Sequence, residues 1–126
     1  MEHVVSFRRL DMLKGTPQPF PYQGSKRYLA NAIVPLIPDG VDRIIEPFCG
    51  SAAVSIAARQ TGKVQSAVIA DINAPLIDLW NEILKEPDRL IAGYTYLWNE
   101  QLSNPREYFK EVRDSFNETH KTALLI

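Results

Sequence analysis

The sequence lacks several features that would assign a protein class at once. It has a single cysteine, Cys49, so no disulfide can form within the chain, and a reducing compartment such as the cytoplasm is the expected location. No apolar run approaches the roughly 20 residues that a membrane span needs. The N-terminus also lacks the apolar core and cleavage site of a signal peptide. We therefore expect no contact with a membrane.

An excess of positive charge is absent as well. Fourteen basic residues meet fifteen acidic ones in the 126 residues, whereas a protein that binds duplex DNA by itself usually presents a basic face. The basic residues that could still form a local patch are Arg8, Arg9, Lys14, Lys26 and Arg27.

Glycine is scarce where a nucleotide-binding turn is expected. A dinucleotide-binding fingerprint needs three glycines in the pattern G-x-G-x-x-G. Here Gly50 is the first of the three, and Ala52 and Ser55 occupy the other two positions. NAD binding is therefore not expected.

What the chain does contain is an alternation of strand-like and helix-like segments. Residues 42–47 (DRIIEP) and 65–71 (QSAVIAD) predict short strands, and residues 51–59 between them predict a helix. This order is typical of the α/β class with a parallel sheet that helices cover on both faces. We expect one domain, with residues 1–19 as a lead-in, 20–85 as a βαβ core and 86–126 as a helical segment.

Four further helices are predicted outside the βαβ unit. The first begins near Ser25 and should stop near Val34, because Pro35 interrupts it. The others begin after Asn73, at Pro87 and after Asn104, the last with Glu107 completing a capping box. Their expected inner faces are, in chain order, Leu29, Ala32, Ile33, Leu36 and Ile37; Leu76, Leu79, Trp80, Ile83 and Leu84; Leu90, Tyr94, Leu97 and Trp98; and Tyr108, Val112 and Phe116.

A carboxylate ends each predicted strand, Glu46 in the first and Asp71 in the second. Ligands of open α/β sheets bind beyond the carboxyl ends of the strands, where Asp71 could accept hydrogen bonds from ribose hydroxyls. Gly50 permits a close approach to the backbone, and the helix that follows offers unpaired N–H groups. The pattern indicates a nucleoside-containing ligand. The alternative is that Gly50 is a plain turn and that both carboxylates only cap helices.

Three blocks in order, PFPYQGSKRYL, EPFCGSAAV and ADIN, resemble the N-terminal part of Dam-type DNA adenine-N6 methyltransferases, and the later EYFKEVRDSFN is similar to a helix of that family. The resemblance covers residues 19–126. It implies a partial Rossmann-like, S-adenosylmethionine-dependent methyltransferase fold with a helical C-terminal part, in a bacterial or phage-type cytoplasm. It also implies a role in adenine-specific DNA methylation, as in restriction-modification.

The resemblance also implies roles for individual residues. Tyr22 would lie against the adenine or the sulfonium of the cofactor, and Lys26 would reach its polar end. Asp71 would hold the ribose hydroxyls, and Glu46 would orient the loop or bind the cofactor's amino group. Phe48, Cys49 and Gly50 would line the methionine part, and Ile72 would contact the adenine. The full expected cofactor-binding set is Tyr22, Gln23, Gly24, Ser25, Lys26, Glu46, Pro47, Phe48, Cys49, Gly50, Asp71, Ile72 and Asn73.

Three positions in these blocks depart from the family pattern. Ala52 replaces a frequent glycine, Ser25 stands where a second glycine is common, and Gln23 is not the usual small residue. Cys49 has two interpretations, an activated nucleophile at a helix N-terminus or a small apolar loop residue. We favour the second, because His3 and His120 lie at the two ends of the chain. No metal site is expected.

The Asp/Asn-Pro-Pro-aromatic motif, which in this family grips the target amino group, is absent from the 126 residues. The family's target-recognition segment is also missing, so we expect no catalytic residue in this chain. We favour the cofactor-binding subunit of a split, heterodimeric methyltransferase, whose partner carries catalysis and target recognition and contacts DNA. That partner would complete the sheet beside Ile44 and Ile45 and cover the terminal ALLI, burying over ~2,000 Å². The alternatives are a non-catalytic regulatory or binding module and an inactive truncated remnant.

Overall fold

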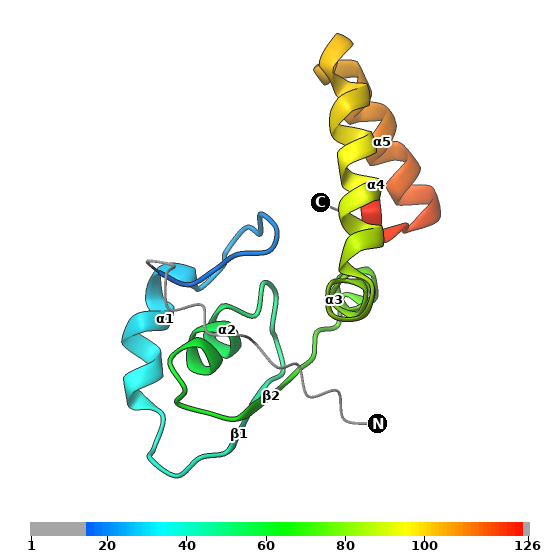
Figure 1. The fold of residues 1–126 in the computed structure, drawn as a ribbon. Coiled ribbons are helices and arrows are strands. Elements are labelled where there is room, and N and C mark those ends of the chain that lie inside the picture. The colour runs from blue at the N-terminus through cyan, green and yellow to red at the C-terminus, as the bar shows by residue number, and fades with distance from the viewer. Residues whose placement is uncertain (1–14, 125–126) are drawn as a thin grey trace. The chain divides into compact units, whose positions relative to one another are not determined.

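A computed structural model describes residues 15–124 of the chain (Figure 1). These residues belong to two compact units, which divide between Ile72 and Asn73. Part of the predicted basic patch and the end of the ALLI run lie outside the described residues: Arg8, Arg9, Lys14, Leu125 and Ile126.

The first unit contains the predicted strand–helix–strand arrangement. β1 (Arg43–Glu46) and β2 (Ser66–Ile69) pair in parallel, with Ile45 opposite Val68, and α2 (Ala53–Gln60) connects them. The α/β order expected from the sequence is thus confirmed as a small two-stranded parallel sheet.

The core of the first unit lies between its helices and one face of the sheet. α1 (Arg27–Ile33) continues into a 3-10 turn, η1 (Val34–Leu36), at Pro35, so the predicted break near Val34 is confirmed. Ala30 of α1 and Ala57 and Ala58 of α2 are almost completely buried, as is Val64. Small side chains on both helices let their backbones approach closely, so little apolar area suffices to fill the space.

The apolar face predicted for the first helix is largely wrong. Leu29 and Leu36 are 56% and 80% exposed and Ala32 is also exposed, whereas Ala30 and Val34 are buried. The buried positions of α1 cluster with Ala57 and Ala58 of α2, so the small Ala30 rather than the larger Leu29 fits the close contact between the two helices. After Pro35 the backbone changes to a 3-10 turn with three residues per turn, which takes Leu36 out of the α-helical period.

One face of the sheet is not covered by the described residues of the first unit. Ile44 packs against the core, whereas its neighbours on the opposite face, Ile45 and Val68, are 69% and 44% exposed. The expectation that both faces are covered is therefore not met within this unit. The uncovered face is an apolar surface on a very small sheet.

The second unit is helical. It comprises α3 (Ala74–Lys85), α4 (Pro87–Glu100), η2 (Gln101–Ser103), α5 (Pro105–Thr119) and η3 (Thr122–Leu124). Its core includes Leu76, Leu79 and Trp80 of α3 and Leu90 of α4. The side-chain hydroxyl of Thr122 donates to Glu82 at 2.6 Å, which ties η3 to α3. No helix in the described part of the chain is long and apolar enough to cross a membrane.

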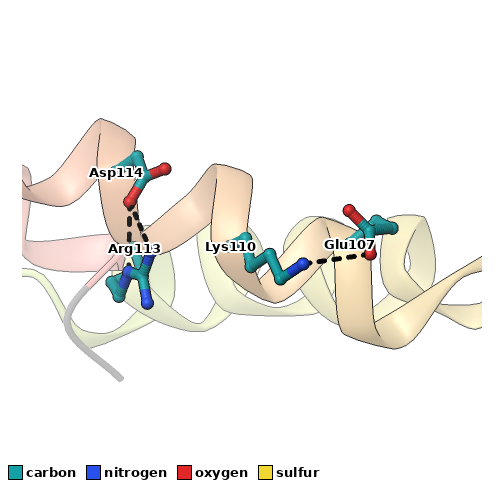
Figure 2. Close-up of polar contacts among 4 residues, drawn as sticks. All are labelled: Glu107, Lys110, Arg113 and Asp114. Carbon is teal, nitrogen blue, oxygen red and sulfur yellow. Dashed lines mark hydrogen bonds and ion pairs between the residues drawn. The ribbon is translucent and has the colours of Figure 1, made fainter.

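The predicted starts of these three helices are confirmed, but the predicted capping box and parts of two inner faces are wrong. In α3, Leu84 is 40% exposed. Asn104 makes no side-chain capping hydrogen bond, and the Glu107 carboxylate instead pairs with Lys110 one turn later at 3.2 Å (Figure 2). In α4, Tyr94 and Trp98 are 37% and 54% exposed. Their rings contact each other at a centroid distance of 6.2 Å. The apolar spacing in this part of α4 therefore corresponds to an exposed aromatic pair and not to a buried face.

Candidate functional site

The turn that follows β1, residues 47–52, is attached to the end of β2; we call it the glycine turn. Oδ2 of Asp71 accepts a hydrogen bond from the backbone N–H of Gly50 at 3.0 Å. The parallel backbone pairing also continues past the strands, because the Cys49 N–H donates to the Ala70 carbonyl at 2.9 Å. Both carboxylate-bearing strand ends and the glycine are therefore brought together, as the sequence predicted.

Glu46 caps the helix that follows the turn. Its Oε2 accepts from the backbone N–H of Ser55 at 3.1 Å and from the Ser55 hydroxyl at 2.6 Å. Ser55 is the third residue of α2, and the N-cap position is Ala52, which has no side-chain oxygen to satisfy these N–H groups. A negative charge at this end also interacts favourably with the helix dipole. Of the roles considered for Glu46, this geometry matches the alternative that the carboxylate caps a helix.

Tyr22 occupies the space that Gly50 leaves open. A Cβ atom placed on Gly50 would lie 2.7 Å from Cε1 of Tyr22, and the φ angle of Gly50 is +49°. The close approach that glycine permits is therefore made by the Tyr22 ring. That ring is 37% exposed and contacts Phe20 edge to face at a centroid distance of 6.3 Å.

A tight turn presents Tyr22 to the glycine turn. The backbone N–H of Ser25 donates to the Tyr22 carbonyl at 3.2 Å, and Gly24 between them has a φ angle of +80°. The hydroxyls of Ser25 and Ser51 lie 2.7 Å apart and join the two turns. The exposed Lys26 side chain folds back, and its Nζ donates to the Gly24 carbonyl at 2.8 Å.

Exposed apolar side chains lie within the glycine turn and directly after Asp71. Phe48, two residues after β1, is 86% exposed, and Ile72, which follows Asp71, is 95% exposed. Pro47 and Gln23 are also exposed. Asn73 is the first residue of the second unit and precedes α3, without a side-chain capping hydrogen bond to that helix. A site at the glycine turn would thus offer both hydrogen-bonding groups and apolar surface.

Cys49 is not prepared for nucleophilic attack. Its side chain is buried, and burial, with smaller contributions from the negative charges of Asp71 and Glu46, raises its pKa to about 11. The thiol is therefore neutral near pH 7, whereas a reactive cysteine needs a lowered pKa. This favours the interpretation of Cys49 as a small loop residue.

Ala52 and Ser55 are the residues whose roles the sequence reasoning left unassigned. Ala52 adopts the left-handed backbone conformation, with a φ angle of +49°, which explains why a glycine suits this position. Ser55, at the third glycine position of the dinucleotide-binding pattern, is the partner of Glu46. Three sequence features were available to suggest this pairing: an acidic residue at the end of the strand, an alanine at the N-cap of the next helix, and a serine three residues after that alanine.

Comparisons with known proteins assign the chain to a family. The profile of the D12 class N6 adenine-specific DNA methyltransferases matches residues 22–125. The chain therefore belongs to this family, as the three sequence blocks indicated. Those residues include the Tyr22 turn, the glycine turn and Asp71.

Individual relatives agree with this assignment. The type II methyltransferase M1.LlaDCHI of Lactococcus lactis subsp. cremoris is 33% identical over 94 residues, which are 75% of this chain and 31% of that protein. The DNA adenine methylase of Serratia marcescens is 29% identical over 107 residues, 82% of this chain and 37% of that protein. The type II methyltransferase M.MjaIII of Methanocaldococcus jannaschii is 33% identical over 81 residues, which are 61% of this chain and 28% of that protein. The chain thus spans about a third of the length of these relatives.

Proposed function

We propose that this chain forms the S-adenosylmethionine-binding part of a DNA adenine-N6 methyltransferase. The observation that carries the proposal is the fixed glycine turn at the carboxyl ends of two parallel strands, held by Asp71 and covered by Tyr22. Nucleotide-like ligands of open parallel sheets bind at this position. When bound, the cofactor supplies the electrophilic methyl group.

The residues at the turn fit such a ligand in their chemistry. The exposed surfaces of Tyr22, Phe48 and Ile72 suit an adenine ring and a methylthio chain, and the Tyr22 ring can attract a sulfonium. The Asp71 carboxylate suits ribose hydroxyls. Glu46 acts through the turn, because Ser55 engages its carboxylate. Lys26 would have to leave the Gly24 carbonyl to reach a ligand.

We further propose that a second polypeptide brings the methyl-accepting half, including target recognition and the contact with DNA. One observation supports this. The exposed Ile45 and Val68 offer an apolar sheet face on which another chain could complete the fold.

The test is methyl transfer from labelled S-adenosylmethionine to DNA. The chain is assayed alone, together with a polypeptide encoded next to it that contains an Asp-Pro-Pro-Tyr-type motif, and with that polypeptide alone. Label on adenine only in the combined assay supports the split enzyme. Label from the companion alone overturns it, and so does a failure of the unaltered chain to bind the cofactor both alone and in the complex.

A further inference from the structure

The hydrogen bond between the hydroxyls of Ser25 and Ser51 links two segments that are far apart in sequence. The two Oγ atoms lie 2.7 Å apart. Ser51 is 3% exposed, whereas Ser25 is partly accessible. The Ser25 Oγ also accepts from the backbone N–H of Arg27 at 3.3 Å. Since a hydroxyl has one proton and two lone pairs, Ser25 can take part in both bonds at once.

The position of this bond ties it to the Tyr22 ring. Ser25 closes the turn that begins at Tyr22, because its N–H donates to the Tyr22 carbonyl. Ser51 directly follows Gly50, the residue against which the Tyr22 ring packs. The bond therefore links the turn that carries the Tyr22 ring to the glycine turn against which that ring packs.

The backbone of the Tyr22 turn does not require a second glycine. Gly24 has a φ angle of +80°, but Ser25 does not adopt a positive φ angle. A Cβ atom on residue 25 is thus tolerated, and the side chain that it carries is free to reach the neighbouring turn.

We infer that Ser25 and Ser51 are positioning residues that hold the Tyr22 ring over the glycine turn and thereby set the affinity for S-adenosylmethionine. The inference rests on the proposed function. It places neither serine in contact with the cofactor; both act through the placement of Tyr22.

The two hydroxyls differ in what their removal leaves behind. Ser25→Ala leaves the buried Ser51 hydroxyl without this partner, whereas Ser51→Ala leaves a hydroxyl that water can reach. Because an unsatisfied buried group is costly, Ser25→Ala should be the more harmful of the two. The double variant Ser25→Ala/Ser51→Ala should weaken binding by less than the product of the two single fold-changes, since both substitutions remove the same bond.

The experiment titrates S-adenosylmethionine into the full chain by calorimetry, at a temperature where circular dichroism shows every variant to be folded. We expect Ser25→Ala to weaken binding about fivefold to tenfold. Ser25→Thr, which keeps a hydroxyl, should restore affinity to within about twofold. The control is Ser66→Ala, which removes a hydroxyl that accepts from Arg43 at the other end of the sheet and should leave affinity unchanged.

The outcomes separate this inference from the proposed function. Equal affinity in the unaltered chain and in Ser25→Ala overturns the positioning role alone, and so do independent, multiplying effects of the two substitutions. No binding by the unaltered chain, alone or with its companion, overturns the proposed function and the role in affinity together. Coupling between the serines in urea unfolding would then still be measurable, because it does not depend on the cofactor.

Discussion

The Asp71 carboxylate receives the backbone N–H of Gly50, 21 residues earlier in the chain, at 3.0 Å. This contact joins the end of one strand to the turn that follows its neighbour. A carboxylate acceptor makes a stronger hydrogen bond than a neutral one, so the link is worth more than an ordinary turn contact. Asp71 therefore shapes the candidate site before any ligand arrives.

Substitution of Asp71 should separate the stability of the turn from ligand binding. Asp71→Ala removes the acceptor, and we expect the free energy of unfolding to fall by about 1–2 kcal/mol and cofactor binding to be lost. Asp71→Asn keeps an acceptor oxygen but no charge, so stability should change by less than about 1 kcal/mol while affinity still falls. Urea unfolding and calorimetric titration measure the two effects. Unchanged affinity in Asp71→Ala would show that the ribose assignment is wrong.

Ala52→Gly should stabilise the protein. Ala52 has a φ angle of +49°, a conformation that costs an alanine about 1 kcal/mol and a glycine little. Part of the gain is offset by the greater flexibility of glycine in the unfolded chain, so we expect an increase of about 0.5 kcal/mol. The matched control is Ala92→Gly on the exposed surface of α4, which should destabilise by about 1 kcal/mol. Effects of the same sign for both would contradict this explanation.

Gly50→Ala should be far more harmful than Gly24→Ala. Both glycines have positive φ angles, but a Cβ atom on Gly24 meets no atom within 4 Å, whereas one on Gly50 meets the Tyr22 ring. We expect a loss of about 1 kcal/mol for Gly24→Ala and more than about 2 kcal/mol for Gly50→Ala. Tyr22→Ala in the Gly50→Ala background should recover part of the excess. Equal losses for the two glycines would mean that the ring does not pack there in solution.

Cys49 should give the protein a distinct response to alkaline pH. The thiol pKa is about 11 in the folded chain against an ordinary value of 9.0, so below pH 9.0 it is protonated in both states and contributes no pH dependence. Between these two values the unfolded chain loses the proton while the folded chain keeps it, and stability falls as pH rises. Urea unfolding at about pH 8 and about pH 10.5 should show a larger loss for the unaltered chain than for Cys49→Ala. An identical loss in both would contradict the raised pKa.

The same residue offers a chemical measurement. At pH 8 a thiol with a pKa of about 11 forms roughly a hundredfold less thiolate than one at 9.0, and burial restricts access further. Iodoacetamide should therefore modify Cys49 slowly in the folded chain and rapidly in urea. Fast modification of the folded chain would restore the nucleophile interpretation that the geometry disfavours.

Much of the fold was predictable because it depends on local signals. Asn73 with Pro75, Pro87, and Asn104 with Pro105 marked three helix starts, since proline is tolerated only in the first turn of a helix. The side-chain partners at those starts were not predictable. Whether Glu107 turns back to the cap or forward to Lys110 depends on small energy differences that the residue pattern does not contain.

The candidate site was predictable in its position but not in its internal contacts. Two acidic residues at the ends of neighbouring strands indicated where the site lies, because parallel strands end at the same edge of a sheet. The sequence could not show that the Glu46 carboxylate binds Ser55, or that the Tyr22 ring packs against Gly50. Both contacts join segments whose separation is fixed only by tertiary packing.

Three hydrogen-bonded links that shape the glycine turn, Gly50 to Asp71, Ser55 to Glu46 and Ser25 with Ser51, lie between residues 22 and 71, in a single compact unit. This stretch is therefore suited to transfer as a cassette into one of the longer relatives. A chimera of that kind would inherit the turn together with its own supports, rather than a loop that the host must reshape. Its activity would reveal whether the two serine hydroxyls and the left-handed alanine are compatible with the catalytic machinery of that relative.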